Sequence, residues 1–288
     1  AMRDLLNEYD DRSMVGEIGV DHTDPLQRMA EYTAGGDKLH MAYTFDLLAP
    51  DHSADYFRKV MATFKANAGD AWPCWAASNH DVKRSATRWG ETEDANAFPL
   101  ISMAMLMSLR GSVCLYQGEE LGLPEADVPF EDLQDPYGIE FWPEYKGRDG
   151  CRTPMVWNST EQAGFSTAKP WLPVDPRHLG LSVDTQEQQN DSTLQKMRQF
   201  IQWRQQQPAL IKGEMELVSD TGDAFIFTRQ CEDQSLLVAI NMTGEELTVP
   251  NTSEIKSVLT GHGFSGRYEN GTIVLPAYQG LFAEVLED

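Results

Sequence analysis

Hydrophobic and polar positions follow two different patterns along the chain, and the change falls near residue 212. Before it, four short apolar runs alternate with stretches of helical periodicity. The runs predict strands at 13–19, 39–48, 72–81 and 111–117, and the intervening stretches predict helices at 25–34, 54–68 and 98–110. Such alternation predicts an α/β fold of parallel strands with right-handed crossovers.

After residue 213 the pattern becomes one of short alternating runs separated by Gly, Asp and Asn turns. This spacing predicts an all-β, antiparallel sandwich with strands at 214–219, 224–230, 235–242, 246–250, 255–259 and 272–276. We therefore expect two domains, residues 1–212 and 213–288. The first contains an excursion without clear periodicity at 119–190, a length typical of functional segments, and a helix at 191–207 that Pro208 ends.

Composition excludes several classes of protein. The 288 residues carry 45 acidic and 23 basic side chains, a formal charge of −22, which disfavours nucleic acid and anionic membrane surfaces as partners. No apolar run reaches the roughly 18–20 residues that span a bilayer. The four cysteines are scattered without metal-site spacing, so we expect no metal and reduced thiols, as in a cytoplasmic protein.

Polar side chains lie where the third predicted strand ends, at Asn79, His80 and Asp81. Active sites of α/β proteins lie at the carboxyl ends of their strands, because the loops there can vary while the strands stay fixed. These three residues could equally cap the next helix. The first predicted strand carries one carboxylate, Glu17, whose burial would be unfavourable without a partner.

Several segments, in order and over almost the whole chain, resemble the α-amylase superfamily, glycoside hydrolase family 13. Within it they are similar to the bacterial α-glucosidase and oligo-1,6-glucosidase branch. The segments that carry the resemblance are 15–18 (VGEI), 79–81 (NHD) with Val82 and Arg84 after it, 111–122 (GSVCLYQGEELG), 131–136 (EDLQDP) and 147–155 (GRDGCRTPM).

The resemblance implies the C-terminal half of a (β/α)8 TIM barrel, strands 5 to 8, followed by the antiparallel domain. It also implies a retaining mechanism, in which two carboxyl groups about 5 Å apart protonate the glycosidic oxygen and attack the anomeric carbon. By resemblance Glu17 is the acid/base, and partial burial would let it hold a proton near neutrality. Asp81 is the family's third carboxylate, which holds sugar hydroxyls, and His80 hydrogen-bonds beside it.

Two arginines follow in the 147–155 segment. By resemblance Arg148 contacts the glucose hydroxyls at the closed end of the pocket. Arg152 more simply forms a structural ion pair in an acidic loop. The expected substrate is an oligosaccharide, with no organic cofactor, because glycosyl transfer needs only carboxylates and binding groups.

The family's nucleophile is an Asp in a Gly-Phe-Arg-x-Asp type motif on the strand before that of Glu17, and no such motif occurs here. We therefore expect the chain to be the C-terminal portion of an exo-acting α-glucosidase, inactive by itself. It should need the N-terminal half of the barrel or self-association to cover its outer strand edges. The alternatives are a transglycosylating or sucrose-isomerising relative and a catalytically silent scaffold.

Overall fold

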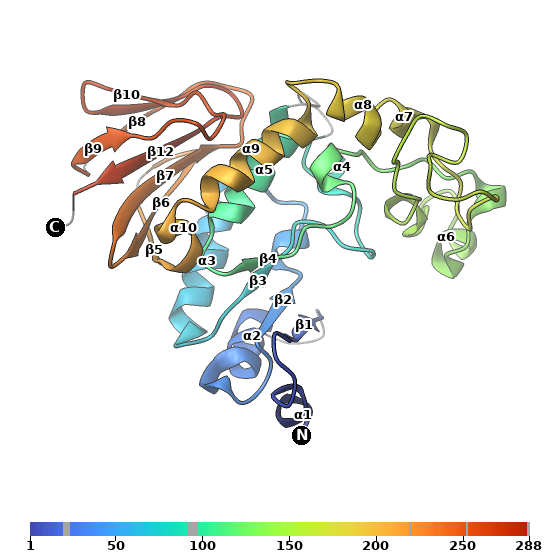
Figure 1. The fold of residues 1–288 in the computed structure, drawn as a ribbon, viewed down its shortest axis with the longest axis horizontal. Helices are drawn as coiled ribbons and strands as arrows, with labels where there is room; N and C mark the ends of the chain where they lie inside the picture. Colours follow the sequence, from blue (N-terminus) through green and yellow to red (C-terminus); the bar gives the residue numbers. More distant parts are fainter. Residues whose placement is uncertain (20–23, 91–96, 219–220, 252, 287–288) are drawn as a thin grey trace. The chain divides into compact units, whose positions relative to one another are not determined.

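The computed structural model describes the chain except for residues 20–23, 91–96, 219–220, 252 and 287–288. It divides into two compact units (Figure 1). Residues 1–76, 104–114 and 202–288 form the first unit, and residues 77–103 and 115–201 form the second. Helices α5 (Ala97–Ser108) and α9 (Thr193–Arg204) each contribute residues to both units.

The first unit contains the parallel strands that the alternating pattern predicts. Strand β1 (Val15–Ile18) pairs with β2 (Met41–Thr44), and β3 (Cys74–Trp75) pairs with β4 (Ser112–Val113), both in parallel. A parallel bridge between Ala42 and Pro73 joins β2 to β3. Within the described residues the order along the sheet is therefore β1-β2-β3-β4, as a βα repeat produces.

Helix α3 (Ala54–Ala68) has the predicted bounds because both of its ends are encoded locally. The side chain of Ser53 accepts the backbone N–H of Tyr56 at 3.2 Å, and Gly69 follows the last turn at a φ of 51°. The buried residues Phe57, Val60, Met61 and Phe64 recur at helical spacing, so one face of the helix packs into the core.

Strands β3 and β4 are much shorter than the predicted runs at 72–81 and 111–117. The apolar residues beyond Trp75 are buried, but they form no ladder in the described structure. Burial alone produces a continuous apolar run without strand pairing, which explains the overprediction at β3 but not at β4, whose run is only partly buried. The remaining helices and 3₁₀ turns of the first unit are α1 (Met2–Leu6), α2 (Pro25–Thr33), α10 (Pro208–Lys212), and turns at Ala34–Gly36 and Asp46–Leu48.

From Glu214 onward, every helix or strand among the described residues is a strand, and all of their pairing is antiparallel. One sheet has the order β5-β6-β7-β12-β9 and the other β10-β11-β8. Their bounds are β5 (Glu214–Leu217), β6 (Ala224–Cys231), β7 (Gln234–Asn241), β8 (Leu247–Pro250), β9 (Ile255–Val258), β10 (Arg267–Glu269), β11 (Thr272–Leu275) and β12 (Gly280–Val285). Buried side chains from both sheets form one core, among them Ile226, Leu237, Ile273 and Leu281.

The sequence pattern missed β10 and β12. Strand β10 has only three residues, too few to show a period. Strand β12 lies between β7 and β9, and its first four residues are all buried, so it lacks alternation. The expected start of the β domain at residue 213 falls between α10 and β5, and the division into domains at that point remains a prediction.

The second unit is mostly irregular, as expected for the excursion at 119–190. Its short elements are α4 (Ser85–Arg88), α6 (Pro136–Glu140), α7 (Pro176–Leu179), α8 (Val183–Glu187) and 3₁₀ turns at Glu119–Leu121, Phe130–Asp132 and Asp149–Cys151. Polar side chains hold this unit together. In the described parts of the chain, no helix is long and apolar enough to cross a bilayer.

Candidate active site

The side chain of Asp81 lies at the centre of an ionic cluster in the second unit. Its Oδ1 accepts Arg148 Nη1 and Arg152 Nη2, each at 3.0 Å. His80 Nε2 lies 3.7 Å from the same oxygen, too far for a hydrogen bond. Among the described residues Asp81 Oδ2 has no partner, so one oxygen of this carboxylate is held by protein and the other remains an available acceptor.

Asn79 shapes the turn that carries Asp81. Its Oδ1 accepts the backbone N–H of Asp81 at 2.9 Å, which orients the peptide before the carboxylate. The amide Nδ2 of Asn79 is buried and has no hydrogen-bond partner within the described part of the chain. A buried donor without a partner is unfavourable, so Asn79 Nδ2 should donate to a group that the described residues do not supply.

Arg148 is fixed from behind by Asp135, a carboxylate with no exposed surface. Asp135 Oδ2 accepts Arg148 Nε at 2.9 Å and Oδ1 accepts Nη2 at 3.0 Å, a bidentate pair, and the backbone N–H of Arg148 adds a third bond at 2.8 Å. The Arg148 hydrogen bonds lower the pKa of Asp135 to about 2, and Asp135 in turn raises the pKa of Arg148.

A second buried carboxylate, Asp149, supports this arrangement. Its Oδ2 accepts the backbone N–H groups of Gln134 and Asp135 at 2.6 and 2.8 Å. Interactions therefore run from Asp149 through Asp135 and Arg148 to Asp81, over residues that are up to 68 positions apart in the sequence.

Arg152 contacts Asp81 as closely as Arg148 does. It also donates from Nε to the backbone carbonyl of His80 at 2.7 Å. Arg152 does form an ion pair, as the sequence predicted. Sequence reasoning missed that its partner is the candidate carboxylate itself.

Two buried ionisable residues, Arg84 and Glu119, anchor the segment that carries Asp81. The Arg84 guanidinium donates to the carbonyls of Gln117 and Cys151 at 2.5 and 3.1 Å. Glu119 accepts Tyr116 N–H at 2.8 Å and the Ser85 hydroxyl at 3.0 Å, and burial raises its pKa. These bonds tie the turn at 78–85 to the segments after β4 and around Arg148.

Glu17 lies in the first unit, on strand β1 beside Tyr43 of β2, with which it is in register. The Tyr43 hydroxyl donates to Glu17 Oε2. The side chain is exposed in this structure, which differs from the partial burial expected for an acid/base. The alternating strand directs Ile18 inward and Glu17 outward.

No group of three or more His, Cys, Asp or Glu side chains that could hold a metal ion occurs in the described residues. All four cysteines are free thiols. The cluster around Asp81 combines hydrogen-bond donors on Arg148 and Arg152 with the carboxylate acceptor of Asp81.

These observations agree with family membership. The family described as the α-amylase catalytic domain matches residues 1–213, and the chain belongs to that family. A probable α-glucosidase of Rhizobium meliloti is 44% identical over 285 residues, which are 98% of this chain and 52% of that protein. An oligo-1,6-glucosidase of Heyndrickxia coagulans is 27% identical over 304 residues, 90% of this chain and 53% of its own length.

A solved structure of the α-glucosyl transfer enzyme XgtA has a TM-score of 0.93 and 42% identity, covering 99% of this chain and 53% of that one. The trehalulose synthase MutB of Pseudomonas mesoacidophila shares the fold, with a TM-score of 0.83 at 23% identity. The chain therefore spans about half the length of the relatives it matches.

Proposed function

We propose that this chain is the C-terminal portion of a retaining, exo-acting α-glucosidase that acts on α-1,4 or α-1,6 bonds of short oligosaccharides. In this proposal the parallel strands β1 to β4 are strands 5 to 8 of a (β/α)8 barrel and the protein is cytoplasmic. Glu17 is the acid/base, while Asp81, His80 and Arg148 bind the sugar. The observation that carries the proposal is the arrangement at Asp81, where two arginines hold Oδ1 and no described residue donates to Oδ2.

A carboxylate held in this way can accept a sugar hydroxyl without rearranging, since its orientation is already fixed. The same two guanidinium groups can donate to neighbouring hydroxyls. The nucleophile would come from outside these 288 residues, because the family's motif for it is not among them. Activity would then require that segment to be present, in the same polypeptide or as a separate half that covers the edge strands.

The experiment measures hydrolysis of p-nitrophenyl α-glucoside by the chain alone and with the preceding half of the family's barrel added. We expect activity only with the added half. Glu17→Gln and Asp81→Asn should then each lower kcat/KM by about 10²–10⁴-fold. Asp127→Asn is the matched control, since Asp127 pairs with Lys146 at 2.6 Å and not with the cluster. Equal activity of all variants would refute the assignment.

A transfer reaction is the second candidate, favoured by the 42% identity to the α-glucosyl transfer enzyme. The covalent glucosyl intermediate of a retaining enzyme can be captured by a sugar hydroxyl instead of water. Quantifying glucose against p-nitrophenol released distinguishes the two, since transfer releases less glucose than phenol. A sucrose-isomerising reaction would appear with sucrose as substrate. Lack of any turnover by the assembled halves would favour the scaffold alternative.

A further inference from the structure

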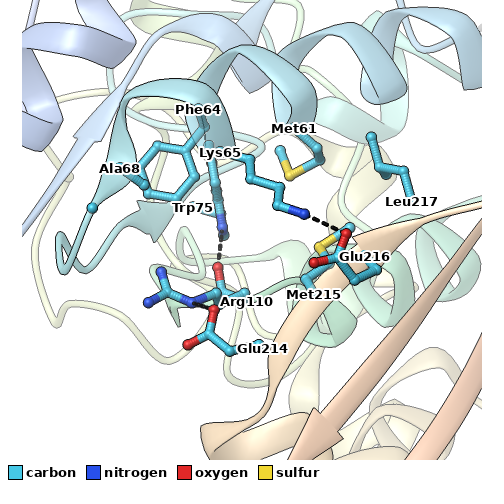
Figure 2. Close-up of a pocket in the computed structure, with 11 residues that line it drawn as sticks. Met61, Phe64, Lys65, Ala68, Trp75, Arg110, Glu214, Met215, Glu216 and Leu217 are labelled. Carbon is cyan, nitrogen blue, oxygen red and sulfur yellow. Dashed lines mark hydrogen bonds and ion pairs between the residues drawn. The ribbon is translucent and has the colours of Figure 1, made fainter. Parts of the chain in front are cut away.

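The first unit contains a cavity of about 300 Å³ whose lining includes none of the residues of the Asp81 cluster. Figure 2 shows it between helix α3, the β3 residue Trp75 and strand β5. Its apolar lining includes Met61, Phe64, Trp75 and Met215, all buried. The volume lies at the lower end of the roughly 300–1,000 Å³ usual for small-molecule sites, so it suits a ligand of one ring.

Two ion pairs border this apolar lining. Lys65 on α3 reaches Glu216 on β5, and Arg110 reaches Glu214 on the same strand (Figure 2). Because Glu214 and Glu216 are two positions apart on one strand, their side chains project from the same face. Each basic group therefore has a carboxylate beside it along one rim of the cavity.

The carboxylates of these pairs are the more accessible partners. Glu214 and Glu216 are 73% and 65% exposed, whereas Lys65 is 54% and Arg110 14% exposed. Arg110 Nε lies 2.8 Å from Glu214 Oε2 but without the alignment of a hydrogen bond, so this buried N–H has no hydrogen-bond partner among the described residues. The Lys65–Glu216 pair is exposed on both sides and contributes little to stability, so a ligand can rearrange this part of the rim at small cost.

The charges of the rim sum to zero, two positive and two negative. An anion or a cation would meet one repulsive group for each attractive one, whereas a neutral ligand with hydroxyl groups can accept from Lys65 and Arg110 and donate to the carboxylates. A pyranose ring combines such hydroxyls with apolar C–H faces, which match the apolar lining.

We propose that this cavity is a second sugar-binding site, selective for a neutral polyhydroxylated ring. It is separate from the Asp81 cluster and does not depend on hydrolysis at that cluster. The ring would lie on the apolar lining, with its hydroxyl groups bridging the basic and acidic members of each pair.

The test is a titration of the full chain with D-glucose, followed by NMR of the Met61 and Met215 methyl groups and the Trp75 indole. We expect saturable shifts of these signals in the millimolar range, with glucosamine and glucuronate binding more weakly because each adds a charge. No shift up to about 100 mM glucose would overturn the proposal, as would tighter binding of either charged sugar.

Variants test the residues. Lys65→Met should weaken glucose binding by about fivefold or more, since it removes a charged donor. Lys59→Met, on the exposed part of the same helix, is the matched control and should bind as the parent chain does. Equal affinity of the two variants would overturn the assignment. Glu216→Gln provides a second change at the rim if Lys65→Met does not fold.

A third variant separates this proposal from the proposed function. In Asp81→Asn, glucose should shift the signals of Met61, Met215 and Trp75 as it does in the parent chain, because Asp81 does not line the cavity. Loss of these shifts in Asp81→Asn would assign the sugar to the Asp81 cluster and overturn the second site. Saturable shifts in the chain, combined with no hydrolysis after the preceding half of the barrel is added, would support the second site while the proposed function fails.

Discussion

Replacing Asp135 by Asn should destabilise the second unit by removing the group that fixes Arg148. The Asp135 side chain has no exposed surface and accepts three bonds from Arg148, two of them in a bidentate pair. An Asn of the same shape keeps one acceptor oxygen but turns an N–H₂ group towards donors of Arg148. The substitution therefore removes the negative charge of Asp135 and places the NH₂ group of the new Asn against an N–H of Arg148, so that two donors face each other.

Two independent arguments give the magnitude. The pKa of Asp135 falls from 3.8 to about 2, and a difference of this size corresponds to about 2 kcal/mol of folding free energy. Truncating one partner of a buried pair costs about 3–5 kcal/mol. Arg148 is 29% exposed and keeps its bond to Asp81, so the loss should lie below that range. We expect Asp135→Asn to lower the free energy of unfolding by about 2–3 kcal/mol.

The assay is urea unfolding at pH 7, followed by tryptophan fluorescence, with Asp132→Asn as the control. Asp132 pairs with Lys169 at 3.1 Å on the surface, so its loss should cost less than about 1 kcal/mol. Because the pKa of Asp135 is depressed, its contribution is present above the unfolded value of 3.8 and is lost as the pH falls towards 2. The difference between the parent chain and Asp135→Asn should therefore narrow between pH 4 and pH 2. Equal losses in the two variants, or a difference that stays constant down to pH 2, would refute the reasoning.

Three further substitutions test buried or closely packed positions in the two units. Arg229→Lys should lower the unfolding free energy by about 2 kcal/mol, because one ammonium cannot replace a buried guanidinium that donates to three backbone carbonyls. The control, Arg267→Lys on the surface, should change the unfolding free energy little. Gly111→Ala should lower the unfolding free energy by about 2 kcal/mol or more, measured by thermal unfolding, since φ is 130° and an added Cβ would lie 2.7 Å from Pro73. Gly180→Ala is the control, because a Cβ added there would have no described atom within 4 Å. Burial raises the pKa of Glu119, so the parent chain should lose stability as the pH rises through that raised pKa. Glu119→Gln should not show this loss. An equal loss of stability in the parent chain and in Glu119→Gln would contradict the argument.

The fold could be predicted from the sequence wherever local signals and periodicity coincide. Helix α3 has a Ser cap, one apolar face and a terminal Gly, and its predicted bounds are those observed. The short strand β3 was overpredicted because a buried run is apolar whether or not it pairs, whereas the run around β4 is only partly buried and its overprediction has no such explanation. Strand β12 was missed for the related reason that burial on both faces removes alternation.

The candidate site was predictable in its members but not in its connections. The Asn-His-Asp turn stood out as polar residues at the end of an apolar run, and resemblance to a family added the roles of Asp81, His80 and Arg148. The structure brings these three side chains together, and their roles remain a prediction. Asp135 was passed over although an Asp-Pro pair suggests a helix start, since nothing local shows that its carboxylate also binds an arginine 13 residues later. Such contacts have no sequence period, so pattern reasoning cannot find them.

The arrangement at Asp81 also explains why the two arginines are not redundant. Arg148 is held by Asp135, so its Nη1 can meet Asp81 in only one position, whereas Arg152 is held by the backbone carbonyl of His80 in the same turn as Asp81. One arginine therefore fixes Asp81 relative to the segment around Asp135, and the other fixes it relative to its own turn. Since both donate to Oδ1, the position of Oδ2, which has no partner among the described residues, is fixed from two directions, and this is the preorganisation that the proposed role in binding a hydroxyl would require.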